Sequence, residues 1–135
     1  MEATDQLHHY SGALCAATDS SGQCASVFYV METLPGSASV TQELVDQMNA
    51  AGYRAEVVAA YQTAGGAPYL DYTDTVFGQV YQGMDIVDAM ACVDTVKDED
   101  GNDTYHPTEE AAITIYHVTI TTYAAEPDND LETVG

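Results

Sequence analysis

Positive charge is what this sequence lacks most. Its 135 residues include 22 acidic side chains but only two basic ones, Arg54 and Lys97, giving a formal net charge of −20. Nucleic-acid binding is excluded, because a surface almost without bases cannot neutralise phosphates. Binding to an anionic membrane surface is excluded for the same reason. Self-repulsion should keep the chain in solution but weaken its compact state at low salt. A halophilic source or a deliberate removal of bases would each give this composition.

Cysteine and long apolar runs are also scarce. Cys15, Cys24 and Cys92 are odd in number and form no C-x-x-C pair, which argues against a disulfide framework and predicts a reducing compartment, the cytoplasm. Cys15 and Cys92 lie in apolar runs, so we interpret both as small core residues. No apolar run reaches the length of a membrane-spanning helix, and residues 1–5 do not resemble a leader peptide. The length and the ordinary apolar fraction of 46% predict one globular domain.

Metal and hydrolase motifs are missing as well. His8 and His9 are adjacent rather than four apart, so we predict a surface pair whose side chains diverge, not two metal ligands. The acidic stretch 94–103 cannot be an EF-hand, because its register would put Val96 and Pro107 at ligand positions. We predict a solvated acidic turn there, with weak calcium binding as the alternative. No G-x-S-x-G, H-E-x-x-H or phosphate-binding loop occurs, and no metal or cofactor is predicted.

The first half of the chain predicts two strands and then two helices. Strands are expected at 12–17 and 27–31, joined by the turn-rich loop 18–26. Ser39 is the predicted N-cap of a helix that ends near Gly52 and carries Val40, Leu44, Val45 and Met48 on one face. A second helix at 54–63 turns Val57, Val58 and Tyr61 inward and ends at Gly65-Gly66.

The second half is organised around residues 67–93. A polar loop leads into a strand at 75–80, Gly83 ends it, and a helix follows with Ile86, Val87, Met90 and Ala91 on one face. Residues 111–123 form the clearest strand by composition, with a bulge expected near Tyr116-His117. Residues 124–135 form an acidic tail that we predict to be disordered.

Three blocks resemble the cyclophilin family of peptidyl-prolyl cis-trans isomerases. Residues 70–88, L-D-x-x-x-T-V-F-G-Q-V-x-x-G-M-D-I-V-D, closely match the family run L-D-G-x-H-x-x-F-G-x-V-x-x-G-M-x-x-V. Residues 12–17 and 27–30 are similar to G-x-L-(S/C)-M-A and Q-F-F-I, and residues 107–120 to P-x-E-x-V-x-I-x-x-I. The resemblance covers about 7–123 and includes a helical insertion at 35–66, similar to that of some bacterial members.

The family fold is an eight-stranded antiparallel β-barrel with two helices. We therefore expect a mainly β protein with helices (α+β): a partial or open cyclophilin-like barrel of about four strands and three helices, with the domain at 1–123 and the tail at 124–135. Four strands cannot close such a barrel, so the sheet should have open edges. Completion by an N-terminal half, self-association edge to edge, and an open sheet packed on the helices are the three resulting alternatives.

The resemblance also implies a substrate groove. Ala17 matches the Ala that grips the substrate backbone and Leu70 the pocket Leu. Tyr29 stands for the pocket Phe, adding a hydroxyl, and Tyr69 for the flanking Trp. Thr18 replaces an Asn. Val27 replaces a Gln and cannot hydrogen-bond a peptide, and Asp74 replaces a His and puts a charge at the pocket edge.

No catalytic residue is assigned. The F-H-R-V-I and F-M-x-Q-G-G segments that carry the family's catalytic Arg are absent from this sequence, and Arg54 stands elsewhere. The first hypothesis is a peptidyl-prolyl isomerase (rotamase) that assists folding by isomerising X–Pro bonds of unfolded polypeptides. The alternatives are a non-catalytic module that binds extended proline-containing peptides, and a truncated product with no function of its own.

Overall fold

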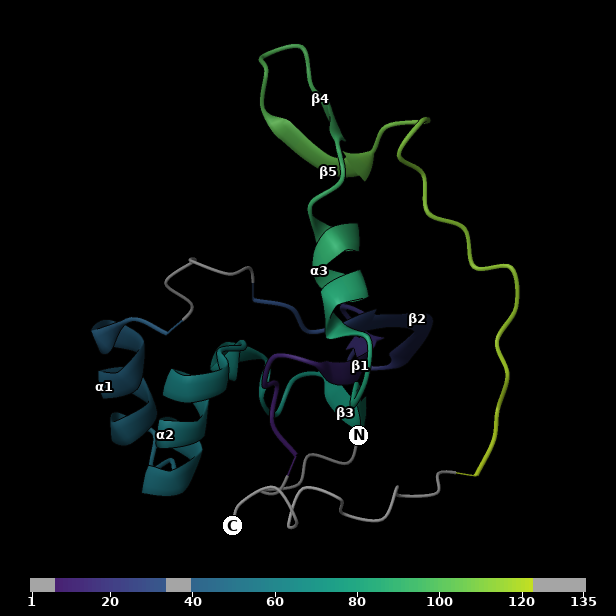
Figure 1. The fold of residues 1–135 in the computed structure, drawn as a ribbon. Helices are drawn as coiled ribbons and strands as arrows, with labels where there is room; N and C mark the ends of the chain where they lie inside the picture. The colour runs from purple at the N-terminus through teal and green to yellow at the C-terminus, as the bar shows by residue number, and fades with distance from the viewer. Residues whose placement is uncertain (1–6, 34–39, 123–135) are drawn as a thin grey trace, which may run out of the picture. The chain divides into compact units, whose positions relative to one another are not determined.

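A computed structural model describes residues 7–33 and 40–122, which fall into two compact units, residues 1–94 and 95–135. The first unit contains three helices and three strands (Figure 1): β1 (Ala13–Thr18), β2 (Cys24–Val30), α1 (Gln42–Ala50), α2 (Ala55–Ala64), β3 (Thr75–Gln79) and α3 (Met84–Ala91), with a 3₁₀ turn η1 (Pro68–Leu70) before β3. The second contains β4 (Thr95–Lys97) and β5 (Asp103–Pro107).

The sheet of the first unit is built on β1. This strand lies between β2 and β3 and runs antiparallel to both. Its inward side chains are small: Ala13 and Cys15 are fully buried and pack with Val76 of β3, while Tyr29 and Met31 cover them. Small residues on the central strand let the larger side chains of its neighbours close over it. The predicted hairpin is therefore confirmed, and β2 and β3 remain edge strands within the described residues.

The two predicted helices of the insertion are confirmed, and they pack on each other. Their shared core consists of Val45, Met48, Val57, Val58 and Tyr61. Helix α1 starts later than predicted, because Thr41 is its N-cap and accepts a hydrogen bond from the backbone N–H of Leu44 at 3.2 Å. Ser39, the predicted cap, lies outside the described residues.

Residues 8–11 run between the insertion and the sheet. Tyr10 pairs with Gly66 in an isolated bridge, and the carbonyl of His9 accepts a hydrogen bond from the N–H of Ala67 at 2.9 Å. Gly66 has a φ of 125°, and a Cβ on it would overlap the His9 carbonyl oxygen. Glycine is therefore required where the two backbones meet.

The second unit contains a hairpin that was not predicted. The turn between β4 and β5 is held by Asp98, whose carboxylate accepts from the N–H groups of Asp100 and Asn102. Lys97 and Asp103 pair at 2.9 Å across the strands, and hydrogen bonds from the Lys97 ammonium and the Tyr105 N–H lower the pKa of Asp103 to about 2. The solvated acidic turn is confirmed, but its flanks are strands rather than loop.

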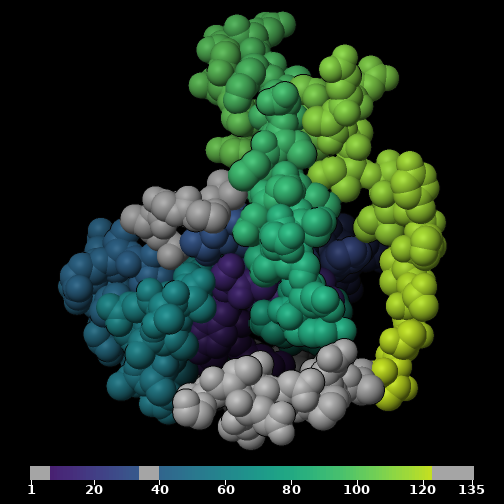
Figure 2. All heavy atoms as spheres, in the orientation of Figure 1, coloured from purple at the N-terminus to yellow at the C-terminus, as the bar shows by residue number. Residues whose placement is uncertain are grey.

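The strand predicted at 111–123 is wrong for the residues described. Residues 112–122 have no regular secondary structure, and Ile113, Ile115, Val118 and Ile120 are all exposed. Figure 2 shows this part of the chain as a single extended file of atoms, coloured yellow-green to yellow. Its composition suits a strand, but no strand in the described residues supplies the backbone partners that a ladder needs. The predicted bulge at Tyr116-His117 is absent for the same reason.

The α+β class and the open sheet are confirmed, with five strands in the described residues instead of about four. Helix α3 forms as predicted, but it buries no residue, and Ile86 on its apolar face is 59% exposed. Cys15 is buried as expected, whereas Cys92 is exposed, because the end of α3 packs against nothing in the described residues that would cover it. No helix within the described ranges combines the length and the apolarity needed to cross a bilayer. The tail at 124–135 lies outside the described residues.

Candidate functional site

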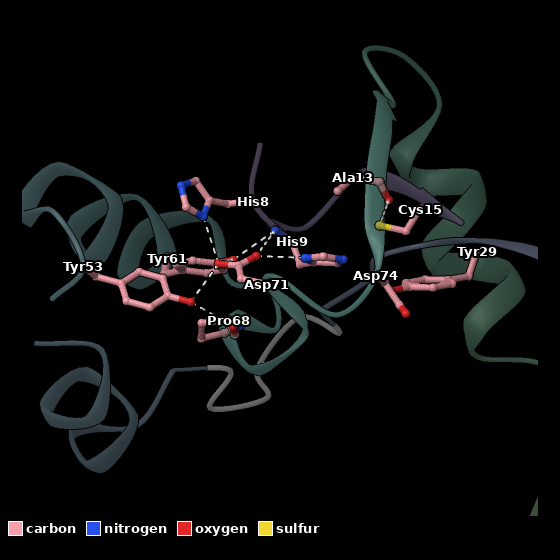
Figure 3. A network of polar contacts seen from close by, with 10 residues as sticks. All are labelled: His8, His9, Ala13, Cys15, Tyr29, Tyr53, Tyr61, Pro68, Asp71 and Asp74. Carbon is pink, nitrogen blue, oxygen red and sulfur yellow. Dashed lines mark hydrogen bonds and ion pairs between the residues drawn. The ribbon is translucent and has the colours of Figure 1, made fainter. Parts of the chain in front are cut away.

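Two of the predicted groove residues, Thr18 and Tyr29, hydrogen-bond to a third, Asp74, which lies directly before β3. The Asp74 carboxylate accepts a hydrogen bond from the Tyr29 hydroxyl at 2.7 Å and another from the backbone N–H of Thr18 at 3.1 Å. The Thr18 hydroxyl donates to the carbonyl of Thr73 at 3.1 Å. These contacts join β1, β2 and the loop before β3, as the sticks in Figure 3 show for Tyr29 and Asp74.

The charge of Asp74, predicted to lie at the pocket edge, is therefore partly compensated by hydrogen-bond donors. Two donors satisfy the carboxylate without any base. Burial raises the pKa of the Tyr29 hydroxyl, and the hydrogen bond to Asp74 raises it further. The hydroxyl stays protonated and donates to Asp74. The aromatic ring is then the part of Tyr29 that offers an apolar surface.

Of the other four predicted residues, Leu70 also contacts Asp74, because its carbonyl accepts a hydrogen bond from the Asp74 N–H at 3.2 Å. Ala17 lies where the β1–β2 register shifts, between the pairs Ala16–Phe28 and Thr18–Cys24. Val27 lies on β2 with 58% of its surface exposed, so it contacts little in the described residues. Tyr69 and Leu70 lie together in η1, where Tyr69 is 72% exposed. The structure thus joins Thr18, Tyr29 and Leu70 to Asp74 and leaves Val27 apart.

The most densely bonded group in the described chain is one that the sequence did not single out. Asp71, at the end of η1, is buried and accepts from five donors on two oxygens (Figure 3). One oxygen lies 2.8 Å from Nδ1 of His9 and 3.0 Å from its backbone nitrogen. The other lies 2.9 Å from Nδ1 of His8, 2.8 Å from the Tyr61 hydroxyl and 3.1 Å from the Tyr53 hydroxyl.

The prediction of a surface histidine pair is therefore wrong. His8 and His9 are 5% and 1% exposed, because both rings turn their Nδ1 atoms toward the same buried carboxylate. Since a carboxylate only accepts, each Nδ1 carries the proton, and each Nε2 is buried without a partner among the described residues. Sixty-two or sixty-three residues separate the partners, so no local pattern could have revealed them.

The network fixes Asp71 as an anion. Burial alone would raise the pKa of the Asp71 carboxyl, but hydrogen bonds from His9, His8 and Tyr61 outweigh it and hold that pKa below its usual range. Burial, reinforced by Asp71, raises the pKa values of the Tyr53 and Tyr61 hydroxyls, so both remain donors. The result is a fixed position for η1, and hence for Tyr69 and Leu70 beside it.

A cleft of about 450 Å³ opens beside this network. It is lined by the end of α1 and the start of α2 on one side and by η1 on the other, and Tyr53, Arg54, Tyr69 and Tyr72 are among its lining side chains. An adjoining depression of about 160 Å³ shares Tyr53, Pro68 and Tyr69 with it. The described residues contain no cluster of three or more His, Cys, Asp or Glu side chains that could hold a metal ion.

The first unit thus combines a small antiparallel sheet, a helical insertion and a cluster of predicted groove residues at Asp74. The family comparison then gives the class its name: the sequence model described as "Cyclophilin type peptidyl-prolyl cis-trans isomerase/CLD" matches residues 1–120. The chain belongs to the cyclophilin-type peptidyl-prolyl cis-trans isomerase family, as the resemblance predicted.

Two staphylococcal relatives illustrate the match. A Staphylococcus saprophyticus protein named "putative peptidyl-prolyl cis-trans isomerase" is 29% identical over 90 residues, covering 67% of this chain and 44% of its own length. A Staphylococcus aureus protein of the same name is 31% identical over 80 residues, covering 59% of this chain and 39% of its own. The chain thus spans less than half the length of the curated relatives it matches.

Proposed function

We propose that this chain binds extended X–Pro segments of unfolded polypeptides and isomerises the X–Pro bond. The observation that carries the proposal is the grouping of Thr18, Tyr29 and Asp74 at one point of the sheet. These are three of the positions at which the family resemblance places the substrate groove, and they come from segments up to 56 residues apart.

Isomerisation of an X–Pro bond requires few chemical groups at such a site. The barrier to rotation about a peptide bond is about 18–20 kcal/mol, and it falls when the twisted amide is bound better than the planar one. An apolar surface for the proline ring and donors to the twisted amide are sufficient, without a nucleophile. Tyr29 offers the apolar ring, while its hydroxyl and the Thr18 backbone hold Asp74 in place.

A non-catalytic peptide-binding module is the second candidate. One observation favours it: the cluster of Thr18, Tyr29 and Asp74 contains no basic side chain, and Arg54 lines the cleft beside η1 instead. Without a cation, the twisted amide has fewer groups to stabilise it, although the planar peptide can still be held.

A protease-coupled isomerisation assay on a short X–Pro peptide separates the candidates. It should be run in 1 M salt, where a Debye length of about 3 Å screens the self-repulsion, and paired with NMR titration of the same peptide. Acceleration that falls in Asp74→Ala supports the isomerase, with Asp46→Ala, at an exposed position of α1, as the matched control. No acceleration, with saturable shifts at Thr18 and Tyr29, supports the binding module. The absence of both signals refutes both.

Self-association through the open sheet edges is a further proposal. β2 and β3 have unpaired outer edges among the described residues, and Phe28 and Phe77 on them are 57% and 58% exposed. Edge strands of this kind are templates for pairing. Sedimentation velocity over a wide range of concentration in 1 M salt tests it, and a constant monomer refutes it.

We also propose a cytoplasmic location. Cys15, Cys24 and Cys92 are all free thiols, which suits a reducing compartment. Thiol labelling of fractionated cells tests this: labelled protein in the cytoplasmic fraction is expected, and recovery from an oxidising compartment would refute it.

A further inference from the structure

The cleft beside η1 is built from the helical insertion and the segment around η1 rather than from the sheet. Ala51 and Gly52 follow α1, Tyr53 and Arg54 precede α2, and the opposite wall consists of Pro68, Tyr69, Asp71 and Tyr72, with His8 beside them. Because the groove at Asp74 uses none of the insertion, this cleft needs its own explanation.

Its walls present aromatic rings to solvent. Tyr69 is 72% exposed and Tyr72 is 55% exposed, and the Tyr53 and Tyr72 rings are 6.5 Å apart in an edge-to-face arrangement. The Tyr53 hydroxyl points inward to Asp71, beside Pro68 (Figure 3), so its ring is held in place. Rings that meet at an angle around an open volume suit an inserted ring or aliphatic side chain.

The backbone at Tyr72 is strained in this arrangement. Its φ is 67°, a left-handed conformation that a bulky side chain rarely adopts. The family run L-D-G-x-H has a glycine at this point, where glycine adopts the conformation freely. Tyr72 keeps this strained conformation and places its ring on the cleft. Backbone strain of this kind is concentrated at ligand-binding sites.

Charge narrows the ligand class. The net charge of −20 opposes an anionic ligand. The two charged side chains that line the cleft already have partners: Arg54 pairs with Glu56 at 3.3 Å, and the Asp71 carboxylate accepts from five donors. An uncharged ligand leaves both sets of contacts intact. The adjoining depression, which shares Tyr53, Pro68 and Tyr69, adds the apolar side chains of Leu44 and Met48.

We propose that this cleft is a subsite for an uncharged aromatic side chain of an extended peptide, on a residue flanking the proline. The inference rests on the proposed peptide-binding function. Tyr69 and Leu70 are consecutive in η1, one lining the cleft and the other matching the proline pocket, so one bound strand of peptide can reach both. The helical insertion thereby adds selectivity for what stands next to the proline.

The test is an NMR titration in 1 M salt with short acetylated, amidated peptides. One peptide is all alanine around a single proline, a set carries one Phe moved through the flanking positions, and one carries Phe without proline. The variant is Tyr72→Gly, which restores the motif glycine, relieves the strain and removes the ring. The matched control is Tyr105→Gly, because Tyr105 also has a left-handed φ of 59° and does not line the cleft.

At least one proline peptide with Phe should bind about tenfold more tightly than the all-alanine peptide, with shifts at Gly52, Tyr53 and Tyr72. The gain should vanish in Tyr72→Gly and persist in Tyr105→Gly. Equal binding of all peptides, or a gain that survives Tyr72→Gly, would overturn the inference. A further proline peptide, with Lys in place of that Phe, should bind no more tightly than the all-alanine peptide, and tighter binding would overturn the assignment of an uncharged ligand.

The two proposals fail separately. If the all-alanine proline peptide leaves Thr18 and Tyr29 unmoved, the proposed function fails. The proline-free Phe peptide still decides the cleft: shifts at Tyr72 that are lost in Tyr72→Gly support it, and their absence refutes it.

Discussion

Replacing Asp71 with asparagine should destabilise the first unit more than any other isosteric change to a carboxylate in the described chain. Asp71 is 8% exposed and accepts from His8, His9, Tyr53 and Tyr61. Asparagine has the same shape, but it has one acceptor oxygen instead of two and no charge. The substitution therefore tests hydrogen bonding with little change in packing.

The orientation of the new amide follows from the donors. At the His9 edge its nitrogen would face the His9 backbone N–H, which cannot accept. At the opposite edge it would face Nδ1 of His8, which can accept if the imidazole carries its proton on Nε2 instead, and the Tyr53 and Tyr61 hydroxyls, which can rotate and accept. The amide oxygen of the variant would therefore keep the His9 contacts. The variant loses the hydrogen bonds accepted at the opposite edge and the negative charge.

The magnitude is about 3–5 kcal/mol, the cost of removing one partner from a buried, hydrogen-bonded charge set. Adding about 1.5–3 kcal/mol for each of the charge-assisted bonds would exceed this, because bonds that share one acceptor are not independent. Against a total stability of about 5–15 kcal/mol, such a loss brings a small domain close to unfolding.

Urea unfolding in 1 M salt, followed by circular dichroism, measures the effect, since the sequence has no tryptophan. Asp46→Asn is the control, because Asp46 is exposed on α1 and accepts only from Gln42 among the bonds described. It should change the free energy of unfolding by no more than about 0.5 kcal/mol. A loss below about 1 kcal/mol in Asp71→Asn, the value of an exposed pair, would refute the claim that this network fixes the position of η1.

The remaining predictions concern pH, a helix cap and a glycine. Because the pKa of Asp71 is held below its usual range, the stability that its carboxylate contributes is complete above about pH 4 and is lost as the pH falls further. The difference in stability between wild type and Asp71→Asn should therefore shrink below about pH 4. A difference that stays constant down to about pH 2 would contradict this. Thr41→Ala should cost about 1 kcal/mol in urea unfolding, and Thr41→Ser should retain the cap; equal losses would argue against the cap. Gly66→Ala should cost about 3 kcal/mol or more through overlap with the His9 carbonyl. Gly22→Ala, where a Cβ meets nothing, should cost only about 1–2 kcal/mol, and similar losses at the two glycines would refute the overlap.

Local patterns predicted the elements well because their causes are local. The small residues of β1, the apolar spacing of α1 and α2, and the stop at Gly83 all act within a few residues. The segment 111–122 shows the limit of that argument. Its alternating apolar residues suit a strand, but a strand exists only when another segment supplies its hydrogen bonds, and composition does not say whether one does.

The candidate site shows the same difference between what local patterns predict and what depends on distant residues. Family resemblance predicted Thr18, Tyr29 and Asp74 as groove residues, and the contacts among them are consistent with a shared location. The Asp71 network escaped prediction, because a histidine's exposure depends on a carboxylate more than sixty residues away.

Tyr72 departs from the family pattern and also lines the cleft. It stands in the best-matched run of the chain, at a position where the family pattern has glycine, and it keeps the glycine-like backbone. Sequence comparison alone would count it as a mismatch that weakens the resemblance. The structure shows instead that the mismatch adds a ring to a cleft formed with the insertion. A departure from the family pattern and an addition to the family fold thus meet at one place, which is where a selectivity particular to this chain should be sought.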